Sequence, residues 1–497
     1  MYLESQENPL TQPQNPGTVA LTGELSAVLL LAAIVALPVS LGLLRRYRHA
    51  VIASMHERAK ERMAGSLPPE ASTLPEVPGQ SVSDLRTIDR ASSSMAGPSA
   101  AHLATLLRAP WQAAVIYAVA GLGYALAMAA ASLASWGIEF LPFRLLVFLW
   151  ICAWPVVLTI GLVAAATRRA RLLTTLGYFF VLAILGVVAI VRSPTVSFGS
   201  IAVLWAINNV PATVLIWAFL NRRVRAVGPL VLAFMVLACA GSIVALHIVG
   251  SNERLLRAIA DLGALLGVGG AGAFIGLIVL GFVVFALIGW LVLRWIGGRY
   301  EHKKISDQSV TLDSMWLLFG VVQSIPLVFG GTSYILSGLV AFAVYKAINW
   351  VGVALMRRDT APENSPNLLL LRVFSLGKRS ERLFDALAKH WRHVGSIRLI
   401  AGPDLATITI EPHEFLDFLS GKLARRFIDS PETLELRISE MDLQPDRDGR
   451  FRVNDFFCHE DTWQITLSQL VDESDAVLMI CAVFRPRTGA SSTRSTG

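Results

Sequence analysis

Long apolar stretches that recur from Leu25 to Leu355 constrain this chain more than any other feature. Each is about 20 residues long, the length at which an α-helix crosses the hydrocarbon core of a bilayer. Inside lipid the backbone must satisfy its own hydrogen bonds, so such stretches are either helices or strands of a closed barrel. Barrel strands alternate polar and apolar residues, and these stretches do not. With 54% hydrophobic and 16% charged residues, the chain is predicted to be a polytopic α-helical membrane bundle.

The stretches predict about nine membrane-spanning helices. The predicted spans are 25–44, 110–135, 141–166, 172–192, 201–220, 228–250, 264–294, 312–330 and 332–356. The last two meet at Gly330-Gly331, and merging them into one span would move the C-terminal region to the other side of the membrane.

Charges at the ends of these stretches predict the orientation. Basic residues follow every second span, at 45–48, 168–171, 222–225, 294–304 and 357–358. The positive-inside rule therefore places the N-terminus outside and the C-terminus in the cytoplasm of a multi-pass inner-membrane protein. Acidic residues precede the first span and arginines follow it, the reverse of a cleavable signal peptide, so we expect this helix to be retained. The formal charge of +7 forms no long basic face with interleaved aromatics, which indicates lipid rather than nucleic acid as the partner.

The remaining segments complete the predicted organisation. Residues 1–24 form an external tail, 25–44 the first membrane helix, 45–109 a basic helix and Pro/Ser-rich cytoplasmic linker, 110–356 membrane helices two to nine, 357–367 a linker, 368–480 a cytoplasmic α/β domain, and 481–497 an aberrant or disordered tail.

Short apolar runs alternate with amphipathic segments in the α/β domain. The predicted strands are 368–374, 397–400, 406–410, 450–457 and 476–480, and the predicted helices are 380–394, 415–428 and 462–471. This alternation is typical of a parallel α/β sheet, and ligands of such sheets bind beyond the carboxyl ends of the strands.

Two polar clusters follow predicted strands and are candidate nucleotide-binding residues. Ser375, Gly377 and Lys378 come after the first strand, where a small-residue turn could hold a phosphate at a helix N-terminus. His459, Glu460 and Asp461 come after a later strand. Ordinary loop and capping roles are the alternative for both clusters. No metal site is predicted, because the Asp446–Gly449 turn lacks the other ligands of a calcium loop and the four cysteines lack metal-ligand spacing.

Polar residues are few within the predicted spans. Asn208, Asn209 and Gln323 could line a polar site, because Pro211 frees a backbone carbonyl nearby. The alternative, which the sequence favours, is hydrogen bonding between helices. Lys346 is expected to extend its amine to the membrane surface. No acidic residue is expected in the middle of a span, which argues against a cation-coupled transporter.

The C-terminal region carries a family resemblance. The segments LLLLRVFS and HEDTWQITLSQLVDESDAVLM, within about the last 130 residues, resemble the Rossmann-like cytoplasmic domains of bacterial membrane proteins related to the TIR and nucleoside-deoxyribosyltransferase group. The resemblance implies a nucleotide such as NAD as ligand, and cleavage of a glycosidic bond by a Glu beyond a later strand. No matching Glu is present, so we expect the chain as written to be a poor NAD or nucleoside hydrolase.

The residues after Met479 suggest a reason for the missing Glu. The tail ICAVFRPRTGASSTRSTG is rich in Arg, Ser, Thr and Gly and continues no preceding pattern. One missing base after the Met479 codon, with permissible codons, would give DLRGFSSAHGGVIYEVNR instead. We therefore expect a frameshift; a native disordered tail is the alternative.

Two functions are consistent with these patterns. The first is a signalling or defence sensor, in which the membrane bundle senses or localises and the cytoplasmic domain binds a nucleotide. The second is a transporter or channel with a regulatory cytoplasmic domain, whose path is lined by Asn208, Asn209 and Gln323. A membrane scaffold without a ligand, and homo-oligomerisation, remain open on the sequence alone.

Overall fold

The computed structural model describes most of the helical region and the core of the sheet. The described residues are 16–63, 100–163, 168–193, 196–219, 227–250, 252–301, 305–356, 365–372, 387–388, 391–401, 412–441, 443–446, 450–459 and 462–480. The predicted strand 406–410, most of the predicted helix 380–394 and the predicted tail 481–497 lie outside them.

Seven described helices are long and apolar enough to cross a membrane. The helices that contain them are α1 (Pro16–Met63), α3 (Ala100–Ser135), α6 (Arg168–Arg192), α7 (Phe198–Phe219), α10 (Gly269–Glu301), α11 (Asp307–Ser324) and α12 (Ser337–Met356). The pair α4 (Pro142–Cys152) and α5 (Trp154–Val163) is bent by 44° and makes an eighth if it forms one span. Helix α8 (Gly228–Gly250) has a shorter described apolar part. The predicted helical bundle with several candidate membrane spans is therefore confirmed, whereas a count of nine spans stays a prediction.

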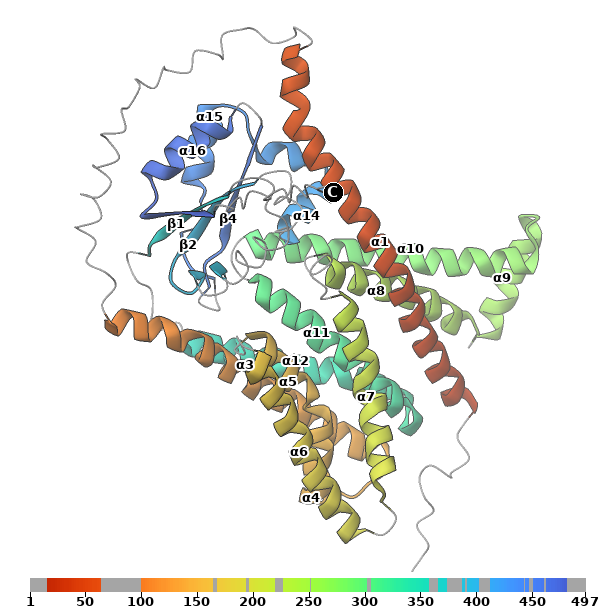
Figure 1. Ribbon diagram of the computed structural model, residues 1–497. Helices are drawn as coiled ribbons and strands as arrows, with labels where there is room; N and C mark the ends of the chain where they lie inside the picture. Colours follow the sequence, from red (N-terminus) through yellow and green to blue (C-terminus); the bar gives the residue numbers. More distant parts are fainter. Residues whose placement is uncertain are drawn as a thin grey trace, which may run out of the picture.

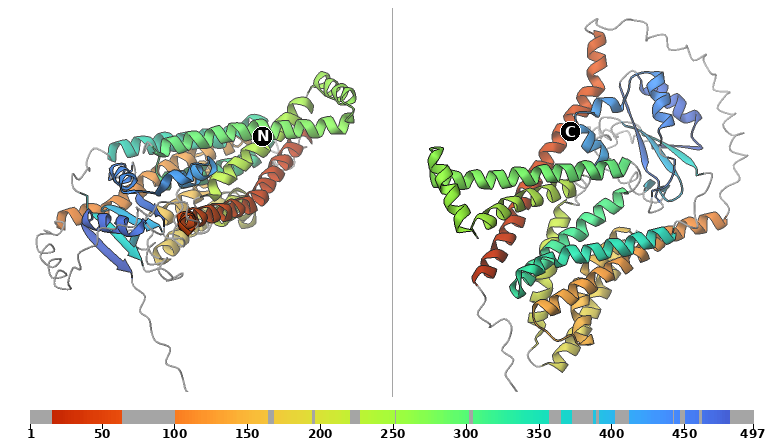
Figure 2. Two further views of the ribbon diagram at one scale, coloured as in Figure 1. Left: turned by 90° about the horizontal axis from the view of Figure 1, so that it is seen from above. Right: turned by 180° about the vertical axis from the view of Figure 1, so that it is seen from behind.

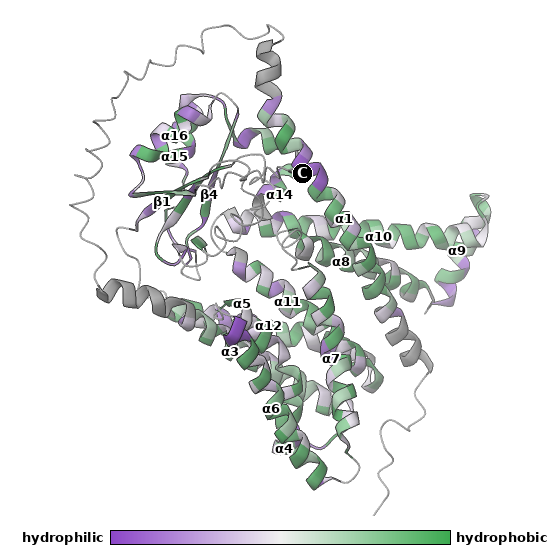
Figure 3. Cartoon of the chain, viewed as in Figure 1, coloured by the Kyte–Doolittle hydropathy of each residue, from purple (hydrophilic) through white to green (hydrophobic). Residues whose placement is uncertain are grey.

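Helix α1 joins two segments that the sequence analysis separated. It is one helix of 48 residues that begins at Pro16, inside the predicted tail, and continues to Met63. The boundary predicted at Leu44 and Arg45 lies within it, because the basic residues after the apolar stretch keep helical geometry. Figure 1 shows its second half running beside the sheet, and Figure 3 shows the change from apolar to polar residues along its length.

Helices α11 and α12 form an antiparallel hairpin. The 3-10 turns η3 (Ile325–Gly330) and η4 (Thr332–Leu336) join them. The Ser324 hydroxyl donates to the Gly320 carbonyl at 2.7 Å and accepts from the Gly338 amide at 2.8 Å. Gly331 reverses the chain with a φ of +150°, a conformation that favours glycine. The prediction of two separate helices here is confirmed.

Helices α8, α9 (Glu253–Leu265) and α10 form an arm that projects from the other helices (Figure 2). Helices α8 and α10 approach closely at two glycines. A Cβ at Gly241 would clash with the Gly281 carbonyl oxygen, and the Ser242 hydroxyl donates to the Ile278 carbonyl at 3.0 Å. Small residues allow this approach between membrane helices.

Replacing Gly241 with leucine is therefore expected to force α8 and α10 apart. Overpacking at such a contact costs about 1–3 kcal/mol, measured as a lower free energy of unfolding of the protein in detergent. Gly276→Leu is the matched control, because a Cβ at Gly276 meets no atom within 4 Å. Equal stability of the two variants would show that α8 and α10 do not pack through Gly241.

A five-stranded parallel sheet forms the C-terminal part, residues 365–480, which we call the sheet region. Its strands are β1 (Asn367–Arg372), β2 (Ser396–Ala401), β3 (Phe427–Ile428), β4 (Val453–Cys458) and β5 (Ala476–Ile480). Their order is β3-β4-β2-β1-β5, with Leu368 opposite Ile397 of β2 and Ala476 of β5. The predicted parallel sheet is confirmed.

Helices cover one face of this sheet. Leu434 of α15 (Pro431–Ser439) and Leu470 of α16 (Trp463–Asp472) pack against Leu369 and Phe456. A helix is present where 415–428 was predicted, but the predicted extent is wrong. Instead, α14 (Pro412–Leu419) ends before Gly421, whose φ of +72° stops the helix, and η6 (Leu423–Arg426) leads into β3.

Candidate functional site

The sheet region is attached to the helices through Arg452, which lies just before β4. The last carbonyls of a helix lack helical partners, and Arg452 Nη2 donates to one of them, the Tyr300 carbonyl of α10, at 2.8 Å. Its guanidinium lies 4.0 Å from the Tyr300 ring centroid, and its Nε donates to Asp446 Oδ1 at 3.0 Å. A cation at a helix C-terminus also suits the helix dipole. All three side chains are buried.

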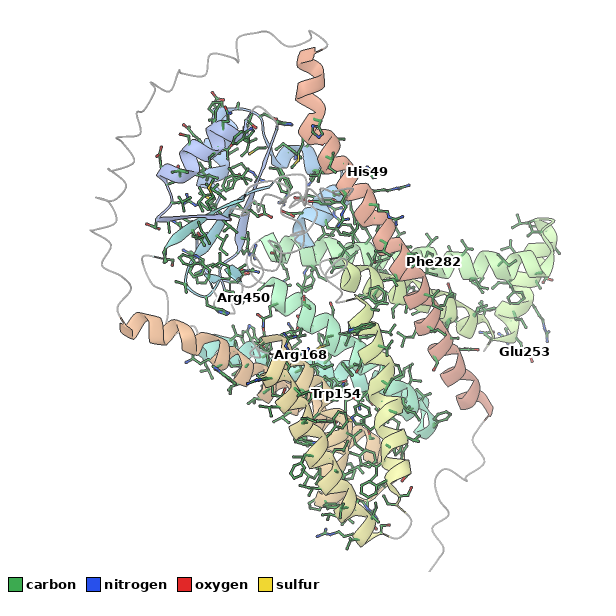
Figure 4. The ribbon with its side chains drawn as sticks, viewed as in Figure 1. His49, Trp154, Arg168, Glu253, Phe282 and Arg450 are labelled. Carbon is green, nitrogen blue, oxygen red and sulfur yellow. The ribbon has the colours of Figure 1, made fainter. Side chains whose placement is uncertain are left out.

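A second arginine reaches the next helix. Arg450 Nη1 donates to Gln308 Oε1, in the first turn of α11, at 2.7 Å, and Figure 4 shows Arg450 between the sheet and the helices. Leu416 of α14 packs in a small apolar core with Leu293 of α10 and Val310 of α11. The ends of α10 and α11 are thus held by polar and apolar contacts together.

The polar half of α1 contributes the third contact. The rings of Tyr47 and Phe418 meet edge to face at 5.4 Å. The surrounding buried core includes Val51 and Met55 of α1 with Phe427 and Phe457 of the sheet. These side chains keep α1 helical beyond its apolar stretch because they bury one of its faces.

A buried hydrogen-bond network connects three helices in the middle of the bundle. Gln323 Nε2 of α11 donates to Asn209 Oδ1 of α7 at 3.2 Å, and the Tyr124 hydroxyl of α3 donates to Gln323 Oε1 at 3.0 Å. All three side chains have 0% exposure. The two predicted polar residues Asn209 and Gln323 are therefore brought together.

The break between α4 and α5 explains the second bond of Asn209. Pro155 has no N–H and cannot donate to the Ile151 carbonyl four residues earlier. Asn209 Nδ2 donates to that carbonyl at 3.1 Å. Nearby, Trp205 Nε1 donates to the Tyr178 hydroxyl at 2.9 Å, and that hydroxyl donates to the Trp150 carbonyl at 2.9 Å. Asn209 therefore supplies a hydrogen-bond donor for a carbonyl that Pro155 leaves without its usual helical partner.

Asn208, the third predicted residue, does not join this network. Within the part of the chain that the structure describes, its Nδ2 donates to the Leu204 carbonyl of its own helix, at 2.8 Å. The side-chain amides of Asn209 and Gln323 form hydrogen bonds with other protein atoms. This favours the first alternative, hydrogen bonding between helices. The second alternative, a solute path lined by Asn208, Asn209 and Gln323, is less well supported.

The sequence analysis missed an ion pair inside the helices. Lys346 Nζ of α12 lies 2.7 Å from Asp313 Oδ2 of α11, and the two side chains are 42% and 21% exposed. Lys346 is thus paired with Asp313, and its extension to the membrane surface stays a prediction. The signal was available: Asp313 is the second residue of the predicted span 312–330, and the hairpin fold places it opposite Lys346.

Only one of the six predicted nucleotide-binding residues lies among the described residues. Ser375, Gly377, Lys378, Glu460 and Asp461 lie outside them. His459 follows β4, and its Nε2 lies 2.9 Å from Asp429 Oδ1, at the end of the neighbouring β3. Its backbone N–H donates to Thr462 Oγ1 at 3.0 Å. The His459 contacts are those of a loop residue at the carboxyl edge of the sheet.

Cys458 is the last residue of β4 and lies next to His459. It is buried, and burial raises the pKa of the Cys458 thiol to about 11. The sulfur lies 3.4 Å from Thr466 Oγ1. A thiol with this pKa carries almost no thiolate at neutral pH, so Cys458 is a poor nucleophile.

The described residues hold no group of three or more His, Cys, Asp or Glu side chains able to bind a metal ion. The candidate functional groups among the described residues are thus His459 at the carboxyl edge of the sheet, the Asn209 network and the Asp313–Lys346 pair. No protein-family model, curated protein or solved structure matches this chain.

Proposed function

We propose that this chain is an integral inner-membrane sensor whose helical bundle is coupled to a nucleotide-binding sheet region in the cytoplasm. The observation that carries the proposal is the attachment at Arg452, which ties β4 to the last turn of α10 through buried groups. A domain on a flexible linker would move independently of the membrane. The sheet region instead contacts three helices, α10, α11 and α1.

The route of α1 supports coupling in particular. It contains the first candidate span, and its polar half packs against the sheet region through Tyr47. A shift or rotation of α1 in the membrane is therefore passed to α14 and β4 without a hinge between them. The basic connections at alternate span ends support the cytoplasmic side for the sheet.

The strand order supports a ligand at the carboxyl edge. β1 lies between β2 and β5, so the chain leaves β1 toward one side of the sheet and reaches β5 on the other. Ligands of open parallel sheets bind at such a switch point. The segment with Ser375, Gly377 and Lys378 directly follows β1.

A nucleotide-binding experiment tests the proposal on the full chain in lipid nanodiscs. We expect NAD or adenosine to raise the melting temperature and to slow hydrogen exchange in the last turn of α10 as well as in β1. Lys378→Ala is expected to abolish both effects, and Lys422→Ala, at an exposed position, is the control. Binding without any change in α10 would overturn coupling, and no binding of either ligand would overturn the nucleotide proposal.

The transporter alternative has one observation in its favour, the Asp313–Lys346 pair, because ionisable residues within membrane helices commonly mark substrate or ion paths. The transporter alternative predicts a solute flux into proteoliposomes that contain the unaltered protein. It also predicts that this flux is lost in an Asp313→Asn variant. The sensor proposal predicts the same exchange response to nucleotide in that variant as in the parent.

A further inference from the structure

Four buried polar atoms on α11 and α12 have no hydrogen-bond partner among the residues that the structure describes. They are Asp313 Oδ1, Trp316 Nε1, the Tyr345 hydroxyl and Asn349 Oδ1. Trp316 lies three residues after Asp313, and Asn349 lies four residues after Tyr345, so each pair shares one face of its helix. We call these four residues the hairpin cluster.

The members of the hairpin cluster lie close together. The rings of Trp316 and Tyr345 stack with centroids 4.9 Å apart. Lys346, next to Tyr345, holds Asp313 at 2.7 Å, and Asp313 also interacts electrostatically with Tyr345. Trp316 and Tyr345 have 0% exposure and Asn349 has 6%. These interactions therefore link Asp313, Trp316 and Tyr345, and Asn349 lies about one turn after Tyr345 on α12.

Such atoms are costly. A buried polar group without a partner costs about 1–3 kcal/mol, and four of them within one hairpin would offset much of the stability of a typical domain. The set contains a donor at Trp316, acceptors at Asp313 and Asn349, and a hydroxyl at Tyr345 that can do both. The charges of Asp313 and Lys346 cancel. The fitting ligand is thus a small uncharged molecule that both donates and accepts hydrogen bonds.

We propose that the hairpin cluster is a water-binding site inside the helical bundle. Ordered water satisfies mixed donors and acceptors at 2–4 partners each, about what this cluster offers. The hydrogen-bond network of Asn209, Gln323 and Tyr124 differs from the hairpin cluster, because those side chains form hydrogen bonds with one another. The bound water hydrates the Asp313–Lys346 pair and lowers the cost of holding two charges among helices.

The hairpin cluster lies between two other polar contacts of α11. Asp313 lies five residues after Gln308, the residue that binds Arg450 of the sheet region. At the other end, the Tyr124 ring lies 4.9 Å from the Trp316 ring and donates its hydroxyl to Gln323. The site therefore lies along α11 between the attachment point of the sheet, at Gln308, and the amide network at Gln323. The inference rests on the helices alone and is independent of the nucleotide proposal.

Hydroxyl-radical footprinting by brief X-ray exposure tests the site, because radicals formed from bound water modify the side chains that hold it. We expect Trp316 and Tyr345 of the protein in nanodiscs to be modified at least fivefold faster than Trp154 and Tyr178. These controls are also buried aromatics, and their polar atoms bond to Thr213 and to the Trp150 carbonyl. Equal rates for the two sets would overturn the proposal.

The variant Asp313→Leu/Lys346→Met supplies a second readout. It removes the charged pair that holds the water, so modification of Tyr345 is expected to fall to the level of Tyr178. Trp154 modification must stay unchanged, which shows that the bundle still folds. Unchanged Tyr345 modification in a variant with an intact Trp154 signal would contradict water held by this cluster.

Discussion

Replacing Arg452 with alanine is expected to loosen the sheet region from the helices by about 3–5 kcal/mol. The substitution leaves the Asp446 carboxylate buried without its cation, since the Asp446 side chain is 1% exposed. It also removes the donor to the Tyr300 carbonyl and the contact with the Tyr300 ring. Loss of one partner of a buried pair costs more than the pair itself contributes, which is why the effect is large.

Hydrogen exchange of the full chain in nanodiscs measures this loss. Amides of β4 should exchange about a hundredfold faster or more in Arg452→Ala, because each 1.4 kcal/mol is a factor of about ten. Arg437→Ala is the control on the same region: Arg437 pairs with Glu440 at 3.4 Å, and the two side chains are 30% and 55% exposed. A surface pair contributes below about 1 kcal/mol. Equal exchange in both variants would show that Arg452 does not hold the sheet.

Replacing Asn209 with leucine is expected to lower the free energy of unfolding by about 1–2 kcal/mol. Leucine removes the Asn209 donor to the Ile151 carbonyl and leaves that carbonyl with the longer bond from the Tyr178 hydroxyl, at 3.4 Å, because Pro155 has no N–H to donate. It also leaves Gln323 Nε2 without its acceptor.

The adjacent residue provides a matched control. Asn208→Leu has the same change in side chain but removes only a bond to the Leu204 carbonyl of the same helix. We expect a loss of a few tenths of a kcal/mol at most, within the usual range for substitutions away from buried networks. Unfolding of the two variants in mixed micelles compares them, and a larger loss for Asn208→Leu would contradict the assignment of Asn209 as the residue that joins the helices.

The sequence was sufficient for features that repeat along the chain. Apolar stretches of span length predicted the helices, and alternating short strands and helices predicted the parallel sheet, including β5 at 476–480. Periodicity carries this information because burial of one face recurs at each turn or every second residue. It did not predict that the first apolar stretch and the basic helix after it form one continuous helix, which packs against the sheet region through Tyr47.

Contacts between distant residues were not predictable in the same way. Arg452 read as an ordinary residue near a turn, and nothing local indicates that α10 ends against it. Asn209 and Gln323 are 114 positions apart, and their bond depends on the packing of α7 against α11. The pair of Asp313 and Lys346 likewise needs the hairpin. The sequence analysis singled out Asn209, Gln323 and Lys346 as polar residues within predicted spans. Their contacts could be identified only from the packing of the helices.

Cross-linking between α1 and the sheet region tests the central claim, coupling of the bundle to the sheet, most directly. In native membranes, a variant with cysteines at Tyr47 and Phe418, and with the native cysteines replaced, should form the cross-link efficiently with a short bis-maleimide reagent. The rings at these two positions are 5.4 Å apart. A pair at Tyr47 and Leu436, an exposed position on α15, serves as the negative control. Efficient cross-linking of the first pair and not the second is the predicted result; equal, low yields from both would contradict a sheet region fixed to the helices.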